Sequence, residues 1–217
     1  MQFKKTDLFF RLENLRNGFP LMCAEALRSF NTGSPEIALR LVLGAEVFGI
    51  YRISQSIASV LRPALGSLEN IVPKWLGQRM SQAQGGHVWK VYNKATIILF
   101  VLAAILLATV YLLSPWIVGA AFTEVAYDDV NGVIGVLCIT NALFVVSRML
   151  AYRLRSEGSN LDILRAAVTA GFIPIILGLP LIYSFGAIGA GLTIMIGVCV
   201  EITYLSATIA KVSRSRI

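Results

Sequence analysis

Long apolar segments restrict what this chain can fold into more than any other feature. The clearest of them lies at residues 95–118, reads ATIILFVLAAILLATVYLLSPWIV and contains no charged side chain. A helix needs about 20 apolar residues to cross the hydrocarbon core of a bilayer, and such blocks recur along the chain between polar joints. The short alternating segments of a membrane β-barrel are not seen. Only 14% of the residues are charged, against about a quarter in soluble domains, so we expect an all-α integral membrane protein.

Windows of about 20 apolar residues predict six transmembrane helices. They cover residues 18–43, 48–72, 95–118, 130–152, 164–183 and 187–209. The helices would form one bundle over residues 18–210, between a cytoplasmic N-terminal segment at 1–17 and a cytoplasmic basic tail at 211–217. The first helix is the weakest, and the letters NTGSP at residues 31–35 predict a break within it, because glycine and proline interrupt helices.

The positions of the basic residues support this layout. Most of the 19 Lys and Arg lie at the two termini, between the second and third helices, or around the joint of the fourth and fifth. Six crossings place all of these on one side, while the opposite side carries Glu46 and the acidic loop TEVAYDD. Basic loops stay in the cytoplasm, so we expect a multi-pass protein of the cytoplasmic (inner) membrane with both termini inside. The net charge of +7 then reflects topology, and no nucleic-acid partner is expected.

Four basic residues remain, and all fall inside the first two predicted helices: Arg28, Arg40, Arg52 and Arg62. In the second helix, polar residues and one glycine recur from Arg52 with a period near 3.5 residues, so they line one helix face. We name this set the polar stripe: Arg52, Gln55, Ser56, Ser59, Arg62, Gly66 and Glu69. An arginine at the bilayer centre costs about 2.5–3.5 kcal/mol on insertion scales, so the stripe must face a partner helix or a water-filled cavity. Pro63 lies within the stripe and predicts a kink.

Two explanations of these charges compete. The first is a buried ion-pair network, in which Arg28 and Glu25 of the first helix meet the charges of the polar stripe. The second is a hydrated cationic cavity that receives an anionic substrate such as a phosphate or pyrophosphate, which arginine binds with two parallel hydrogen bonds. The four arginines outnumber Glu25, Glu36 and Glu69, so pairing alone leaves positive charge over. This excess favours the cavity.

Several motifs are similar to those of a known transporter family. The run FPLMCAEALRSF…LRLVLGAEVFGIYRISQSIASVLRPAL resembles the opening of the second half of polysaccharide and O-antigen flippases. These belong to the multidrug/oligosaccharidyl-lipid/polysaccharide exporter superfamily. The hairpin LPLIYSFGAIGAGLTIMIG and the stretch LSPWIVGAAF with Tyr127 after it also resemble family motifs, so the likeness spans residues 15–209. This chain has Glu36 where the family often has an aspartate, and it holds one six-helix bundle where the family has two.

The resemblance implies a fold and a function. The chain would be one half of a pseudo-symmetric two-bundle transporter, and its partners would be a second six-helix half, from the same gene or another chain, and membrane lipids. The substrate would be an oligosaccharide on a polyprenyl pyrophosphate, moved across the membrane by alternating access. The substrate cavity would contain Arg52, Arg62, Arg28, Gln55, Ser56, Ser59, Glu69 and Arg40. The alternatives are an exporter of drugs or of a lipid-linked peptidoglycan precursor, and a non-catalytic membrane subunit or fragment.

The remaining polar residues carry weaker signals. Glu201 lies within the last predicted helix. It couples transport to a proton or an ion, with Glu25 as a second candidate, or it pairs with an arginine, or it reaches the membrane interface. A membrane enzyme would need an acid/base pair, a histidine cluster or a metal cluster at a membrane face, and none is seen, so no enzyme activity, metal or cofactor is expected. The GAIGAG run at residues 186–191 predicts close helix packing.

Overall fold

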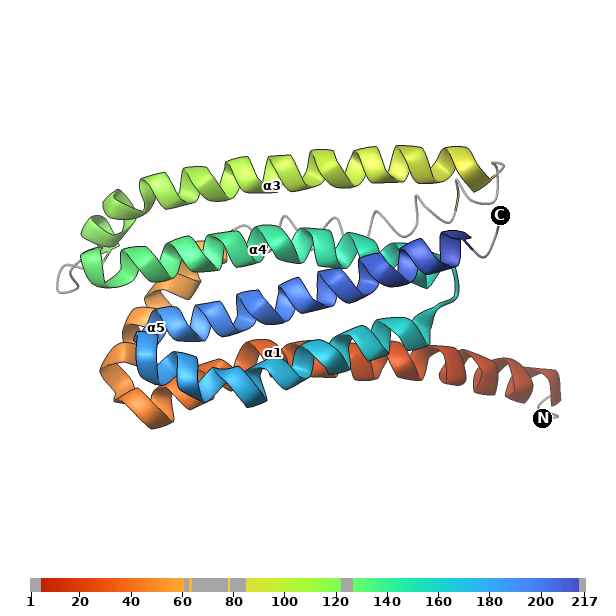
Figure 1. Cartoon of the computed structure of the whole chain (residues 1–217), viewed down its shortest axis with the longest axis horizontal. Helices are drawn as coiled ribbons and strands as arrows, with labels where there is room; N and C mark the ends of the chain where they lie inside the picture. The colour runs from red at the N-terminus through yellow and green to blue at the C-terminus, as the bar shows by residue number, and fades with distance from the viewer. Residues whose placement is uncertain (1–4, 61–62, 64–77, 79–84, 122–126, 215–217) are drawn as a thin grey trace.

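The structure consists of helices throughout its described part. The computed structural model describes residues 5–60, 63, 78, 85–121 and 127–214. Within these ranges the chain forms no strand, and its helices are α1 (Lys5–Ala58), α3 (Gly85–Ala121), α4 (Tyr127–Ser156) and α5 (Asn160–Arg214). Figure 1 shows them side by side along one long axis. The prediction of an all-α protein is confirmed.

Two glycines reverse the chain direction within α1 and α5. Gly44 has φ 85° and ψ −174°, and Gly186 has φ 60° and ψ −133°, a region of backbone space that is open almost only to glycine. Each helix therefore consists of two segments, at residues 5–43 and 45–58 in α1 and at 160–185 and 187–214 in α5. Figure 1 shows both reversals at the end of the molecule where α3 ends and α4 begins, with the two termini at the opposite end.

The helix break predicted at residues 31–35 is wrong. α1 runs through this stretch without a non-helical residue, and its interruption lies at Gly44, inside the predicted joint between the first two helices. Pro35 removes one helical hydrogen bond at a cost of about 3 kcal/mol. Pro35 is buried, and α1 packs along α5. Helix stability in proteins comes mainly from such packing, and here the packing outweighs the missing hydrogen bond.

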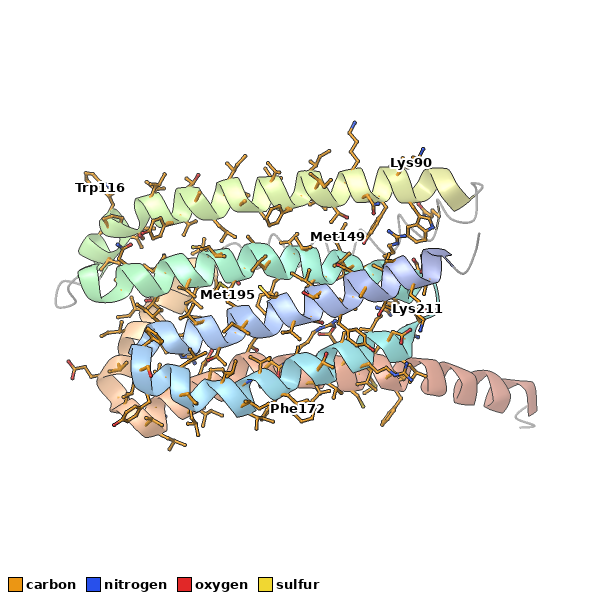
Figure 2. The ribbon with its side chains drawn as sticks, viewed as in Figure 1. Lys90, Trp116, Met149, Phe172, Met195 and Lys211 are labelled. Atoms are coloured by element: carbon orange, nitrogen blue, oxygen red, sulfur yellow. The ribbon has the colours of Figure 1, made fainter. Side chains whose placement is uncertain are left out.

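Three of the described helices are long and apolar enough to cross a membrane. They span Trp89–Ala120, Val130–Ser156 and Asn160–Val212, which indicates membrane association. α1 is not among them, because its charged and polar residues lower its hydropathy. The outer face of α3 is apolar along most of its length, and its exposed side chains include Ile98, Leu102, Ile105 and Trp116. Figure 2 shows Trp116 pointing away from the other helices.

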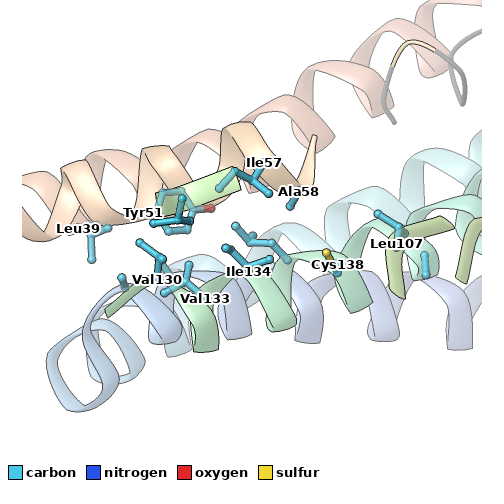
Figure 3. Close-up of a cluster of buried hydrophobic side chains, with 14 of the residues drawn as sticks. Leu39, Tyr51, Ile57, Ala58, Leu107, Val130, Val133, Ile134 and Cys138 are labelled. Atoms are coloured by element: carbon cyan, nitrogen blue, oxygen red, sulfur yellow. The ribbon is translucent and has the colours of Figure 1, made fainter. Parts of the chain in front are cut away.

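A cluster of buried apolar side chains joins all four helices in the half of the molecule that holds the two glycine reversals. Figure 3 shows its centre, with Leu39 and Tyr51 of α1 against Val130 and Ile134 of α4. Leu107 of α3 and Ile182, Ala187 and Ala190 of α5 complete it. A second cluster around Ala24, Leu154, Ile163 and Leu205 joins α1, α4 and α5 toward the termini. These contacts fix the two segments of α1 against α4 and α5.

Small residues after Gly186 allow close contacts, as the GAIGAG run predicts. A Cβ atom on Gly189 would lie 2.0 Å from the backbone oxygen of Leu181, and one on Gly191 would lie 3.0 Å from Cγ1 of Val136 in α4. Larger side chains at these two positions would push apart the two segments of α5 or separate α5 from α4. The close packing predicted for this run is present.

Candidate functional site

The first segment of α1 presents three faces along its length. Its buried face carries Pro20, Ala24, Arg28, Pro35 and Leu39. Beside it runs a polar face with a spacing of three or four residues, half-buried or exposed at each position, made of Glu25, Ser29, Thr32, Glu36 and Arg40. The third face is exposed and apolar, with Met22, Phe30, Ile37 and Leu41. Because side chains at i, i+3 and i+4 share one side of a helix, the polar residues form a continuous band, which we name the polar face of α1.

Four charged side chains form an ion-pair cluster that links three helices. Nη2 of Arg28 lies 2.6 Å from Oε1 of Glu201 in α5, and Nε of Arg28 donates to the same oxygen at 2.7 Å. Nη1 of Arg28 lies 2.8 Å from Oε1 of Glu25. The same oxygen accepts a hydrogen bond from Nη1 of Arg148 in α4, at 2.5 Å. Arg28 is only 7% exposed and Glu201 3%. The cluster holds two positive and two negative charges, so it is balanced.

This arrangement revises the ion-pair hypothesis. Arg28 and Glu25 do pair, but with Glu201 and Arg148 of α5 and α4, whereas the hypothesis placed their partners in the polar stripe. Glu201 pairs with an arginine, which was one of the three roles expected for it. Arg148 is a member that the sequence reasoning missed, because it was counted with the basic joints. Its position inside the predicted helix at 130–152 was the signal that could have found it.

A second cluster lies beside the Gly44 reversal, and we name it the turn cluster: Glu36, Arg40, Phe48, Arg52 and Gln55. Nη1 of Arg52 lies 3.2 Å from Oε2 of Glu36 and donates to Oε1 of Gln55 at 2.8 Å. The Gln55 amide donates in turn to Oε1 of Glu36. Arg40 and Arg52 both lie over the ring of Phe48, with guanidinium carbons 5.8 and 5.6 Å from its centroid. Two arginines face one glutamate here, so the turn cluster has an excess positive charge.

The described members of the polar stripe lie on the outer side of the second segment of α1. Its buried residues are Tyr51, Ser54, Ile57 and Ala58, whereas Arg52 and Ser56 are exposed and Gln55 and Ser59 are half-buried. The side chain of Arg52 is 56% exposed. The predicted period is therefore present in residues 52–59, with Arg52 and Ser56 on the exposed side of the helix and Gln55 and Ser59 half-buried at its edge.

Some predicted site residues lie outside the described part of the chain. Arg62 and Glu69 are among them, as are the neighbours of Pro63 that would define the expected kink. Among the residues that are described, no group of three or more His, Cys, Asp and Glu side chains is placed to hold a metal ion. The structure thus brings Arg28 together with Glu25 and Glu201, and Arg40 together with Arg52 and Gln55, in two separate clusters.

Comparison with known proteins adds no relative: no family model, no curated protein and no solved structure matches the chain.

Proposed function

We propose that this chain is half of a membrane transporter of the polysaccharide-export type. It would carry an oligosaccharide linked to a polyprenyl pyrophosphate across the cytoplasmic membrane by alternating access. The two segments of α1 and of α5, together with α3 and α4, would make six crossings with both termini in the cytoplasm. The second crossing, predicted over residues 48–72, extends beyond the described residues.

The polar face of α1 is the observation that carries this proposal. α3 exposes apolar side chains such as Leu102 and Ile105, as a helix in contact with lipid should. α1 instead exposes Glu25, Ser29 and Arg40, and the adjoining stripe exposes Arg52 and Ser56. Charged side chains in hydrocarbon are costly and mark substrate pathways when they occur. Water or a second protein surface must cover this face, and a second six-helix bundle across it would enclose a hydrated cavity.

The turn cluster has the chemistry that a pyrophosphate requires. Guanidinium groups bind phosphate oxygens with paired hydrogen bonds, and Arg40 and Arg52 are both exposed. Glu36 and Gln55 fix one side of Arg52, which leaves the rest of its guanidinium for a ligand. Arg28 of the ion-pair cluster has its charge balanced by Glu25 and Glu201, so within this arrangement it serves structure and not substrate binding.

Two alternatives share this polar face. A drug exporter or an exporter of a lipid-linked peptidoglycan precursor would use the same cavity for another ligand. A non-catalytic subunit would cover the face with protein and bind no lipid-linked substrate. The excess positive charge of the turn cluster favours an anionic, phosphate-bearing ligand over an uncharged drug and over a subunit that binds no ligand; it does not distinguish the two kinds of lipid-linked precursor.

A binding experiment separates a transporter of pyrophosphate-linked lipids from a drug exporter and from a non-catalytic subunit. The protein would be placed in lipid nanodiscs and titrated with a polyprenyl pyrophosphate, and then with the corresponding uncharged polyprenol. We expect the pyrophosphate to bind and the polyprenol to bind much more weakly. Arg52→Gln or Arg40→Gln should weaken binding about tenfold, since a hydrogen bond to a charged group is worth about 1.5–3 kcal/mol. Lys94→Gln, which removes an exposed charge from α3, is the matched control. Equal affinities for pyrophosphate and polyprenol would contradict the proposal.

A further inference from the structure

Two small, partly open cavities lie between the helices, one beside the ion-pair cluster and one beside Gln55 of the turn cluster. The first offers about 20 Å³ to the centre of a water molecule, and its polar lining is Arg28, Asn31, Thr32, Thr193 and Glu201. The second offers about 10 Å³, and Tyr51, Gln55, Thr140 and Asn141 line it. Thr32, Phe144 and Ile194 line both cavities, so the two spaces share a wall. A cavity needs roughly 10–15 Å³ of such space, and polar partners, to hold a water.

The polar atoms of the first cavity are incompletely satisfied by protein. Oδ1 of Asn31 is buried, and within the described residues no donor reaches it. It faces Gly171 of α5, where a Cβ atom would come within 3.3 Å of Oδ1, so a larger residue at position 171 would crowd the amide. The hydroxyls of Thr32 and Thr193 donate to backbone oxygens of their own helices and can still accept. Buried polar groups are almost always hydrogen-bonded, so Oδ1 of Asn31 needs a donor of the kind that an ordered water can supply.

We infer that ordered water occupies these two cavities and connects Glu201 with Glu36, so that the buried Glu201 exchanges protons with the exposed polar face. Glu201 lines the first cavity, and Gln55 of the second holds Glu36 through its amide. Thr32 lies between them, one helical turn from Arg28 and one from Glu36. Glu36 is half-buried beside the exposed side chain of Arg52, which gives this path its outer end.

The proton balance of the step is simple. A proton leaves a protonated Glu36, which returns to the carboxylate, passes along the waters and binds the carboxylate of Glu201. The charged groups around Glu201 are Arg28 and Glu25 on α1 and Arg148 on α4. Once protonated, Glu201 is neutral and no longer balances the charge of Arg28. Glu25 is then the carboxylate that still pairs with Arg28. The ion-pair cluster then carries an excess positive charge beside the polar face. This inference goes beyond the proposed function, because it needs no transported substrate.

Hydroxyl-radical footprinting of the purified protein tests the water. Tyr51 and Tyr92 are matched probes, because they are 0% and 1% exposed and only Tyr51 lines one of these two cavities. Radicals formed from internal water should modify Tyr51 several times faster than Tyr92. Thr32→Val removes the hydroxyl between the cavities and should at least halve the rate at Tyr51. Thr96→Val changes a threonine with the same bond to its own helix and should leave it unchanged. Equal rates at Tyr51 and Tyr92 would overturn the inference.

Infrared difference spectra recorded as the pH is lowered test the proton. The wild-type protein should show the band of a buried carboxylic acid, and Glu201→Gln should remove that band. The double variant Arg28→Gln/Glu201→Gln keeps the cluster neutral, and it replaces the single variant if that one does not fold. A spectrum without a band that depends on Glu201 would overturn the inference. Neither measurement involves a lipid-linked ligand, so their outcome is separate from that of the binding experiment.

Discussion

The two charge clusters on α1 are built from the same residue types but differ in balance and exposure. In the ion-pair cluster, Arg28 lies buried between Glu201 and Glu25, and its positive and negative charges are equal in number. In the turn cluster, Arg52 is more than half exposed. Glu36 is the one carboxylate of this cluster, and it stands against two arginines, Arg52 and the neighbouring Arg40. The comparison teaches that an arginine in a membrane helix is not by itself a substrate ligand. Its partners decide whether it holds helices together or is left to bind an anion.

Breaking the ion-pair cluster should have the largest effect on stability. Arg28→Gln leaves Glu201 buried without its partner, and removing one member of a buried ion pair costs about 3–5 kcal/mol. The variant should unfold at a clearly lower temperature or denaturant concentration in detergent. The double variant Arg28→Gln/Glu201→Gln should recover most of the loss. A single variant as stable as the wild type would mean that the cluster does not hold α1 to α5.

The Gly44 reversal, which brings Arg40 beside Phe48, should rank second. Gly44→Ala forces a Cβ atom into a backbone region that costs about 1–3 kcal/mol for other residues, although no atom lies within 4 Å of that Cβ. Gly49→Ala is the matched control. Its Cβ also meets open space, and in a helix alanine is favoured over glycine by up to about 1 kcal/mol. The unfolding temperature should therefore fall in Gly44→Ala and rise in Gly49→Ala. Equal shifts in the two variants would contradict the left-handed conformation of Gly44.

The turn cluster should respond to mutation in binding and hardly at all in stability. Arg52→Gln removes an exposed ion pair, and such pairs contribute about 0–1 kcal/mol. Its unfolding curve should nearly match that of the wild type, while polyprenyl pyrophosphate binding falls about tenfold. Arg28→Gln should show the opposite pattern, in which stability falls by much more than binding does. If Arg52→Gln unfolds as readily as Arg28→Gln, the distinction between the two clusters fails.

Phe48→Leu should have the smallest effect. It keeps an apolar side chain of similar volume but removes the ring beneath Arg40 and Arg52, where each cation–π contact at an exposed site is worth about 0.5–1 kcal/mol. We expect a loss of binding of a few-fold and almost no change in the unfolding temperature. Phe30→Leu, on the exposed apolar face of α1, should change neither quantity. A loss of affinity in Phe30→Leu as large as in Phe48→Leu would show that the ring contacts are unimportant.

Sequence reasoning recovered the properties that depend on neighbouring residues. Apolar block length predicted an all-α chain with membrane character, because both follow from local composition. The predicted joint after residue 43 contains Gly44, whose conformation only a glycine adopts readily. The period of Arg52, Gln55, Ser56 and Ser59 is present as a face of the helix. The predicted break at Asn31–Pro35 failed because local helix breakers do not report the packing of α1 against α5 that keeps the helix continuous.

The sequence by itself determined that the chain is helical and apolar, where it reverses at Gly44, and that α1 carries charges which hydrocarbon would not tolerate. Only the tertiary structure decided which charges meet. Arg28 and Glu201 are separated by 173 residues, and no local pattern relates positions so far apart. The structure also decided that Arg52 and Ser56 of the polar stripe face outward, because the apolar positions Tyr51, Ile57 and Ala58 pack into the core. Helix period fixes which residues share a face, but only contact between helices fixes the direction in which that face points.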